Sequence, residues 1–254
     1  GPFMSWKRAD LAAVMQRLLA AGILAMVAIV TAYWLKHGGP VLAPLGIGLG
    51  IWLIAGAFSE LASRSKLFRE PLPVAMRRLF GLPRSAWGSA IAHAGLGVVV
   101  LGVVAVSAWR VEHISVMKPG DQITIAGLDL HYLGSAPRRG PNYEDQVGTF
   151  RAERGGAEIA TLESAKRVYT VRNMPTTEAA IYPLWTGDLY ISLGDATDGG
   201  GRTVRVYYNP LAPLIWIGAV IMFLGGGISL TDRRYRVGAP KRARRAEPQT
   251  TGAA

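Results

Sequence analysis

The sequence contains no cysteine and only four histidines in 254 residues. The absence of cysteine excludes a disulfide scaffold, a thiolate metal site, a CxxC redox site and a cysteine nucleophile. Four histidines also leave few side chains for a metal site. The sequence lacks a Walker lysine motif, an HExxH pair and a GxSxG elbow, so it holds no complete site of these enzyme classes.

Long apolar runs are the most prominent feature that is present: half of the residues are apolar, and the mean hydropathy is +0.23. A helix of about 20 apolar residues crosses a hydrocarbon core of about 30 Å. Four runs reach that length, over residues 11–35, 41–62, 87–109 and 210–230. The first run is too long for the core of a signal peptide, and no cleavage pattern follows it. The sequence therefore predicts four transmembrane helices.

Residues 110–209 have a different character, because they are polar and rich in turn residues. Short alternating runs lie at 122–126, 157–162, 188–193 and 203–208, and turn signals lie at 118–121, 155–156 and 199–201. Short alternating runs between glycine turns are typical of antiparallel strands. This segment is therefore predicted to form a small antiparallel β domain. The adjacent acids Glu144 and Asp145 are interpreted as solvated turn residues within it.

The formal charge of +11 could indicate nucleic acid, anionic lipid or membrane topology. Fifteen basic residues lie before the first span, in 63–86 and in 231–254, against four acidic residues there and Glu60 just before the second of these segments, whereas the β segment carries a net charge of −1. The positive-inside rule then predicts cytoplasmic chain ends and a cytoplasmic 63–86 segment, with the β domain on the other side. No nucleic-acid partner is expected, because no basic face is interleaved with exposed aromatic side chains. The lipid bilayer is the expected partner of the basic segments.

His93 is the one histidine inside a predicted span, and it is followed by the small residues Ala94, Gly95 and Gly97. An ionisable group at that depth is costly without a partner and often marks a functional site. A neutral imidazole can be an axial ligand of haem iron. Alternatively, His93 hydrogen-bonds to another helix, as glycine-rich interfaces allow. The residues alone leave both interpretations open.

The other three histidines receive no functional role. His37 lies in the HGGP turn between the first two spans, and His113 and His131 lie in the β segment. His131 alternates with Leu130 and Tyr132 and is therefore predicted to point away from the core. Glycines at 46, 48 and 50 and at 225–227 lie inside spans, where they indicate helix packing and not a dinucleotide loop.

Several motifs, in order along the chain, resemble the CcmF family of cytochrome c-type biogenesis (haem lyase) membrane proteins. They are GPFMSWKRADL at the start, AHAGLG around His93, RRGPNYEDQ at 138–146, MPTTEAAIY at 174–182, GDLYISLGD at 187–195 and the run from 204 to 236. The resemblance covers nearly the whole chain except the tail, and it matches only the C-terminal portion of the family.

The resemblance implies a role in bacterial system I cytochrome c maturation at the cytoplasmic (inner) membrane, with the β domain in the periplasm. Family members take haem from the haem chaperone CcmE and, with CcmH-type partners, attach it to apocytochrome c. The family also holds a b-type haem between membrane helices through two histidines. His93 matches one of these axial ligands, so the resemblance favours the ligand interpretation.

The sequence also departs from the family pattern. All seven tryptophans are isolated, so the family's tryptophan-rich haem-handling motif is absent. The second membrane haem ligand belongs to an N-terminal part of the family that this sequence does not contain. We therefore expect a fragment, or one piece of a split protein, that needs the missing N-terminal part and is not a competent haem lyase (holocytochrome c synthase) alone.

These inferences combine into an α-helical membrane protein with four transmembrane helices and a small antiparallel β domain between the third and fourth. The expected function is to supply one axial ligand, His93, to haem b and a docking domain for covalent haem attachment to apocytochrome c. The alternative function is a cofactor-free membrane scaffold for a cytochrome maturation complex. The expected segments are two spans with a short outer turn (1–62), a basic cytoplasmic loop (63–86), the His93 span (87–109), the β domain (110–209), the last span (210–230) and a basic cytoplasmic tail (231–254).

Overall fold

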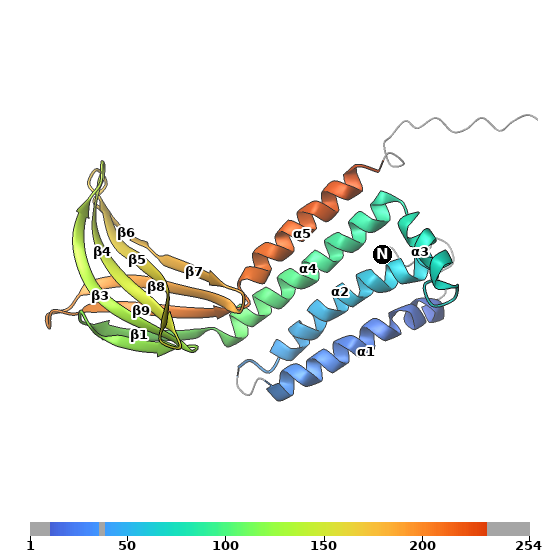
Figure 1. Cartoon of the computed structure of the whole chain (residues 1–254), viewed down its shortest axis with the longest axis horizontal. Coiled ribbons are helices and arrows are strands. Elements are labelled where there is room, and N and C mark those ends of the chain that lie inside the picture. Colours follow the sequence, from blue (N-terminus) through green and yellow to red (C-terminus); the bar gives the residue numbers. More distant parts are fainter. Residues whose placement is uncertain (1–10, 36–38, 233–254) are drawn as a thin grey trace, which may run out of the picture.

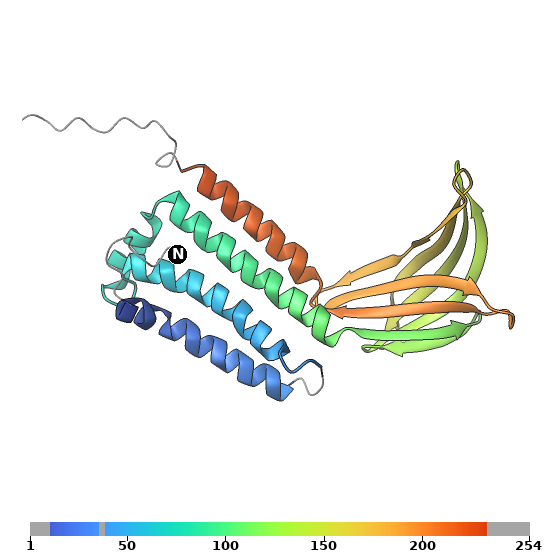
Figure 2. The same ribbon diagram turned by 180° about the vertical axis from the view of Figure 1, so that it is seen from behind.

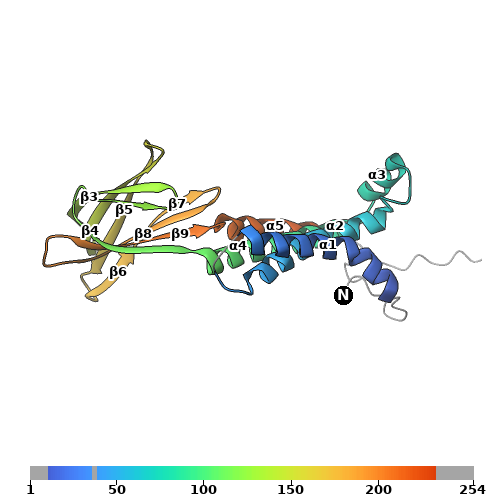
Figure 3. The ribbon, with the colours of Figure 1, turned by 90° about the horizontal axis from the view of Figure 1, so that it is seen from below.

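The computed structural model describes residues 11–35 and 39–232, and in this part of the chain four long helices form one flat layer (Figure 1). Figure 3 shows the layer from its edge. All four helices are long and apolar enough to cross a membrane, which confirms the predicted spans. Expectations for residues 1–10, for His37 and for the tail from 233 lie outside the described residues. In order across the layer, the helices are α1 (Leu11–Leu35), α2 (Ala43–Ser65), α4 (Arg84–Trp109) and α5 (Pro213–Leu230).

Glycines allow α4 and α5 to pack with their backbones in contact. A Cβ atom added to Gly95 would lie 2.8 Å from the carbonyl oxygen of Gly218, and one added to Gly88 would lie 2.5 Å from that of Gly225. On the other side of α4, a Cβ added to Gly97 would lie 2.6 Å from the carbonyl oxygen of Gly50 in α2. Small residues at helix contacts are the usual basis of association in lipid. These contacts fix the rotation of α4 about its own axis.

The β domain is a sandwich of two antiparallel sheets, as Figure 2 shows from behind. One sheet has the order β1-β9-β8-β7 and the other the order β2-β3-β4-β5-β6, which confirms the predicted antiparallel β domain. The β2–β3 turn has two residues with positive φ, Ala126 (50°) and Gly127 (75°), as tight hairpin turns require. The strands are β1 (Val111–Met117), β2 (Gln122–Ile125), β3 (Leu128–Arg139), β4 (Tyr143–Arg154), β5 (Ala157–Tyr169), β6 (Met174–Glu178), β7 (Ala180–Leu184), β8 (Gly187–Ala196) and β9 (Arg202–Pro210).

The core of the sandwich is made by alternating side chains from both sheets. Leu189, Ile191 and Leu193 of β8 are fully buried, in step with the two-residue period of a strand. They share one cluster with Tyr132 and Phe150 of the other sheet, whose ring centroids lie 5.1 Å apart. The sandwich therefore has its own hydrophobic core, separate from the membrane helices.

Two short connections join the sandwich to the helices. Only Arg110 separates α4 from β1, and only Leu211 and Ala212 separate β9 from α5. The strands β1 and β9 pair antiparallel, just as α4 and α5 pack together. The N–H of Leu211 also donates to the carbonyl of Thr186 in the β7–β8 turn, over 3.0 Å.

Segment 63–86 is not the plain loop that the sequence analysis expected, because it contains a nine-residue helix, α3 (Leu72–Phe80). Leu79 packs against the small cluster formed by Ala57, Leu61 and Ala90 of α2 and α4. The indole N–H of Trp87 donates to the carbonyl of Leu79 over 3.2 Å. These tertiary contacts hold a helix that is too short to be stable alone.

Candidate functional site

His93 lies on an open face of the helix layer. The glycines at 88, 95 and 102 face α5 and Gly97 faces α2, so the stripe that contains His93 points out of the layer. His93 itself is exposed, as are Leu96 and Val103 on the same stripe. The spacing of four and three residues along Ser89, His93, Leu96, Val100 and Val103 keeps them on one side of the helix.

A hydrogen bond within α4 sets the chemical state of the His93 ring. Its Nδ1 atom lies 2.7 Å from the carbonyl oxygen of Ser89, one turn earlier, and 3.4 Å from the Ser89 hydroxyl. A carbonyl oxygen only accepts, so Nδ1 carries the hydrogen and donates it. Nε2 of the neutral ring then has a free lone pair, and no hydrogen-bond partner of Nε2 occurs in the described part of the chain.

This arrangement fits a single axial ligand of haem iron. Metal-binding histidines usually donate their second ring N–H to a carbonyl or carboxylate, as Nδ1 does here. Within residues 11–35 and 39–232, no group of three or more histidine or acidic side chains could hold a metal ion. A metal at Nε2 would therefore take its other ligands from its own macrocycle and from another chain segment.

A second polar cluster lies in the β sandwich, around Asp145. Its carboxylate is buried and accepts from Arg167 Nε at 2.8 Å, Arg167 Nη2 at 3.1 Å and Arg138 Nη2 at 3.2 Å. The hydrogen bonds from Arg167, followed by those from Arg138, hold the pKa of the Asp145 carboxyl below its ordinary value. The guanidinium of Arg167 also lies over the Tyr143 ring, 3.7 Å from its centroid. Asp145 is thus a structural centre and not a solvated turn residue.

Comparison with known proteins places the chain in a family. Residues 108–210 match the family described as "CcmF C-terminal beta-sandwich". The chain is 49% identical, over 97% of its length, to the "Cytochrome c-type biogenesis protein CycK" of Rhizobium meliloti. The chain belongs to the CcmF family, over the C-terminal portion of its members. The CcmF of Escherichia coli is 31% identical over 99% of the chain.

The solved structure "Cytochrome c Heme Lyase CcmF" superposes on 91% of this chain with a TM-score of 0.67. At 18% sequence identity, that likeness shows a shared fold. The chain spans 36% of the length of the Rhizobium and Escherichia relatives and 37% of the solved CcmF chain. The predicted resemblance to CcmF is therefore confirmed for the C-terminal portion of the family.

The structure of this CcmF-family chain does not bring a second described histidine to His93. His113 is exposed on β1. On β3, His131 lies between the buried residues Leu130 and Tyr132, and its Nε2 is 3.4 Å from Oε2 of Glu153 on β4. His93 lies about 24 Å along α4 from Trp109, at 1.5 Å per residue. The haem-ligand candidate and the sandwich histidines therefore belong to separate regions.

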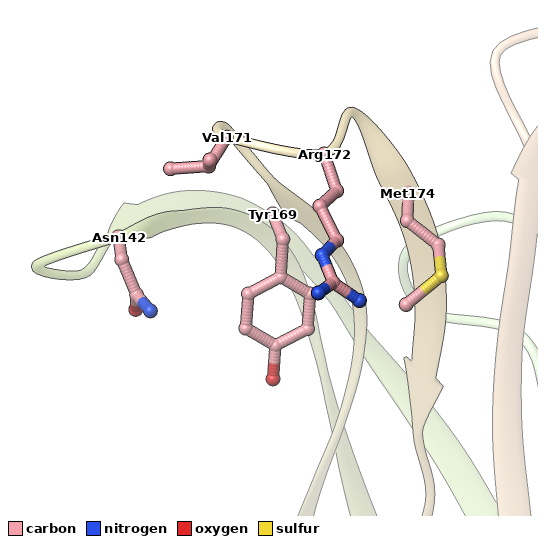
Figure 4. Close-up of a pocket in the computed structure, with 5 residues that line it drawn as sticks. All are labelled: Asn142, Tyr169, Val171, Arg172 and Met174. Carbon is pink, nitrogen blue, oxygen red and sulfur yellow. The ribbon is translucent and has the colours of Figure 1, made fainter.

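A shallow hollow lies at the end of the CcmF-family sandwich where the β3–β4 turn meets the β5–β6 hairpin (Figure 4). Figure 4 shows Tyr169 and Arg172 of the β5–β6 hairpin beside Met174, with Asn142 of the β3–β4 turn across from them. Val171 completes the lining and is 90% exposed. The hollow is open and is not part of the His93 site.

Proposed function

We propose that His93 is one axial ligand of a membrane-embedded haem b and that the second axial ligand comes from outside this chain. The observation that carries the proposal is the hydrogen bond from Nδ1 to the Ser89 carbonyl, which leaves the Nε2 lone pair free on an open face. The family supports it, because CcmF-type proteins act in cytochrome c biogenesis and the solved structure with the same fold is that of a cytochrome c haem lyase.

Residues of α4 hold the imidazole for this role. The Ser89 carbonyl accepts from Nδ1, which limits rotation of the ring and leaves Nε2 as the nitrogen that can bind iron. Leu96, Val100 and Val103 continue the same stripe with apolar side chains, so the helix face next to His93 is apolar. The bound haem would supply one-electron redox chemistry.

We further propose that the β sandwich is a docking domain in the haem lyase reaction of the whole protein. Its partners would be the haem chaperone CcmE, a CcmH-type subunit and apocytochrome c, and it would work together with the missing N-terminal part. The support is its position beyond the membrane helices and its separate core. In the alternative function, a scaffold without a cofactor, the sandwich is still a docking domain but the protein binds no haem.

Replacing His93 by alanine tests the ligand role. We expect His93→Ala to remove nearly all of the bound haem b from the purified full-length protein, because no other described side chain offers an Nε2 lone pair on this face. The reduced absorption spectrum and the yield of matured cytochrome c measure the loss. His113→Ala, on the exposed surface of β1, is the control and should leave both unchanged. An unaltered spectrum in His93→Ala with normal maturation would favour the cofactor-free scaffold.

We also propose that the chain lies in the bacterial inner membrane, with both chain ends in the cytoplasm and the sandwich in the periplasm. The support is the charge of the 63–86 segment, which has six basic residues and one acidic residue, beside a sandwich segment close to neutral. A reporter fused after Asp232 should be active only in the cytoplasm, and one inserted near Gly200 only in the periplasm. The opposite pattern would reverse the proposed orientation.

A further inference from the structure

The helix α3 lies across the ends of the long helices, at the end of the layer opposite to the β sandwich. Figures 1 and 3 both show its axis running across the direction of α2 and α4. If α2 and α4 span a bilayer, α3 runs along the membrane surface at the level of their ends. This position is independent of His93 and of the β sandwich.

One side of α3 is apolar and open. Leu72, Met76 and Phe80 follow one another at intervals of four residues, so they lie on one side of the helix. Leu72 is 64% exposed and Phe80 74% exposed, and Phe68 in the preceding turn is 89% exposed. Ala75 is fully buried, and Leu79 packs on the α2–α4 cluster. These contacts prevent α3 from rotating its open apolar side inward.

The segment that contains α3 carries more positive charge than its one acidic residue, Glu70, can neutralise. Glu70 contacts Arg78 at 3.1 Å and Lys66 at 3.9 Å. Arg69 and Arg77 are exposed and have no carboxylate partner among the residues that the structure describes. The segment 63–86 has a net charge of +5. Cations beside an apolar face match a surface that has anionic headgroups above hydrocarbon.

We propose that α3 and the turn before it form an interfacial anchor that binds the anionic lipid leaflet. Leu72, Phe80 and Phe68 enter the boundary of the hydrocarbon, and Arg69 and Arg77 contact lipid phosphates. A lipid surface fits better than a protein partner because the helix lies at the level where the long helices end and combines exposed aromatics with unpaired arginines. Such helices bind through buried apolar area together with attraction to anionic lipid.

Because the sequence has no cysteine, a single introduced cysteine is a unique labelling site. Spin labels at Leu72→Cys and Phe80→Cys would be compared in phosphatidylcholine vesicles with and without phosphatidylglycerol, using the full chain. Val27→Cys in α1, where the Val27 side chain is 57% exposed, is the reference for hydrocarbon. Asp198→Cys in the exposed β8–β9 turn is the reference for water. Relative collision rates with oxygen and with a water-soluble nickel chelate report depth.

We expect the ratio of oxygen collisions to nickel-chelate collisions at both α3 labels to be closer to that of the Val27 label than to that of the Asp198 label. The ratio should increase when phosphatidylglycerol is present. Adding Arg69→Gln and Arg77→Gln to the Phe80→Cys chain should abolish that increase. Three results would contradict the proposed anchor. The α3 labels could be as accessible to the nickel chelate as the Asp198 label, or they could be shielded from both reagents by protein. Their depth could also be the same with and without phosphatidylglycerol.

Discussion

Asp145→Asn is expected to destabilise the β sandwich by about 2–4 kcal/mol, because the substitution removes a buried carboxylate and leaves two arginines facing each other. Arg167 keeps Glu178 at 3.4 Å as a second partner, so the loss stays below that of a fully isolated charge. The unfolding midpoint of the β-sheet circular dichroism signal in denaturant, measured on the full chain, reports the change.

The neighbouring acid provides a matched control. Glu144 is 61% exposed and pairs only with Arg139, which is 82% exposed, at 3.5 Å. Exposed ion pairs contribute little, so Glu144→Gln is expected to change stability by less than about 0.5 kcal/mol. If Glu144→Gln and Asp145→Asn had equal effects, the cluster around Asp145 would not be a structural centre.

The same cluster predicts how sandwich stability depends on pH. The pKa of Asp145 is lowered in the folded state, chiefly by the hydrogen bonds from Arg167. Its contribution is therefore fully present above the carboxyl's ordinary pKa of 3.8 and is lost as the pH falls below that value towards the lowered pKa. Asp145→Asn should accordingly flatten the decline in stability that the wild-type chain shows over this acidic range.

Gly95→Ala is expected to weaken the contact between α4 and α5 by about 1–3 kcal/mol, the usual cost of overpacking. The new Cβ would lie 2.7 Å from the Met222 backbone nitrogen and 2.8 Å from the Gly218 carbonyl oxygen, and neither can move without its helix. The loss of helical circular dichroism in detergent micelles, on titration with dodecyl sulfate, measures the effect.

Gly226→Ala makes the same chemical change in α5 at a position with nothing within 4 Å of the added Cβ. Alanine is the better helix former, so this control should be neutral or stabilising by about 1 kcal/mol. Gly95→Ala is therefore expected to destabilise the helix pair, and Gly226→Ala is not. Equal effects would mean that α4 and α5 do not pack through these glycines.

The membrane helices could be predicted from the sequence because each is a long apolar run that needs no tertiary information. Helix α3 was not predicted, although Leu72, Met76 and Phe80 have the four-residue spacing of a helix, because its nine residues are a short run inside a segment interpreted as a loop from its charge. Its helical state depends on the contact of Leu79 with α2 and α4, and on the Trp87 hydrogen bond. Those partners are known only once the chain has folded.

In the sandwich, the predicted runs coincide with parts of β2, β5, β8 and β9, and the other five strands were not predicted as separate runs. The burial of β3 alternates from Leu128 to Tyr132 and then stops at the register shift before Gly134. Past that point its side chains are mostly exposed, so no two-residue period marks the strand. Asp145 was missed for a related reason, because its partner Arg167 is 22 residues away on the next strand.

His93 was a candidate from the sequence because a histidine within an apolar span needs a partner. The sequence could not fix which ring nitrogen carries the hydrogen. That depends on the side-chain rotamer that brings Nδ1 within 2.7 Å of the Ser89 carbonyl. It equally could not show that the stripe of His93 faces away from both neighbouring helices, which follows from the glycine contacts of α4.

The pairing of β1 with β9 continues directly into the packing of α4 with α5, with at most two residues at either junction. Strands and helices together form a single antiparallel arm, anchored at both connections and without a flexible tether. A movement of the sandwich would therefore be passed through a single residue, Arg110, to α4, the helix that carries His93.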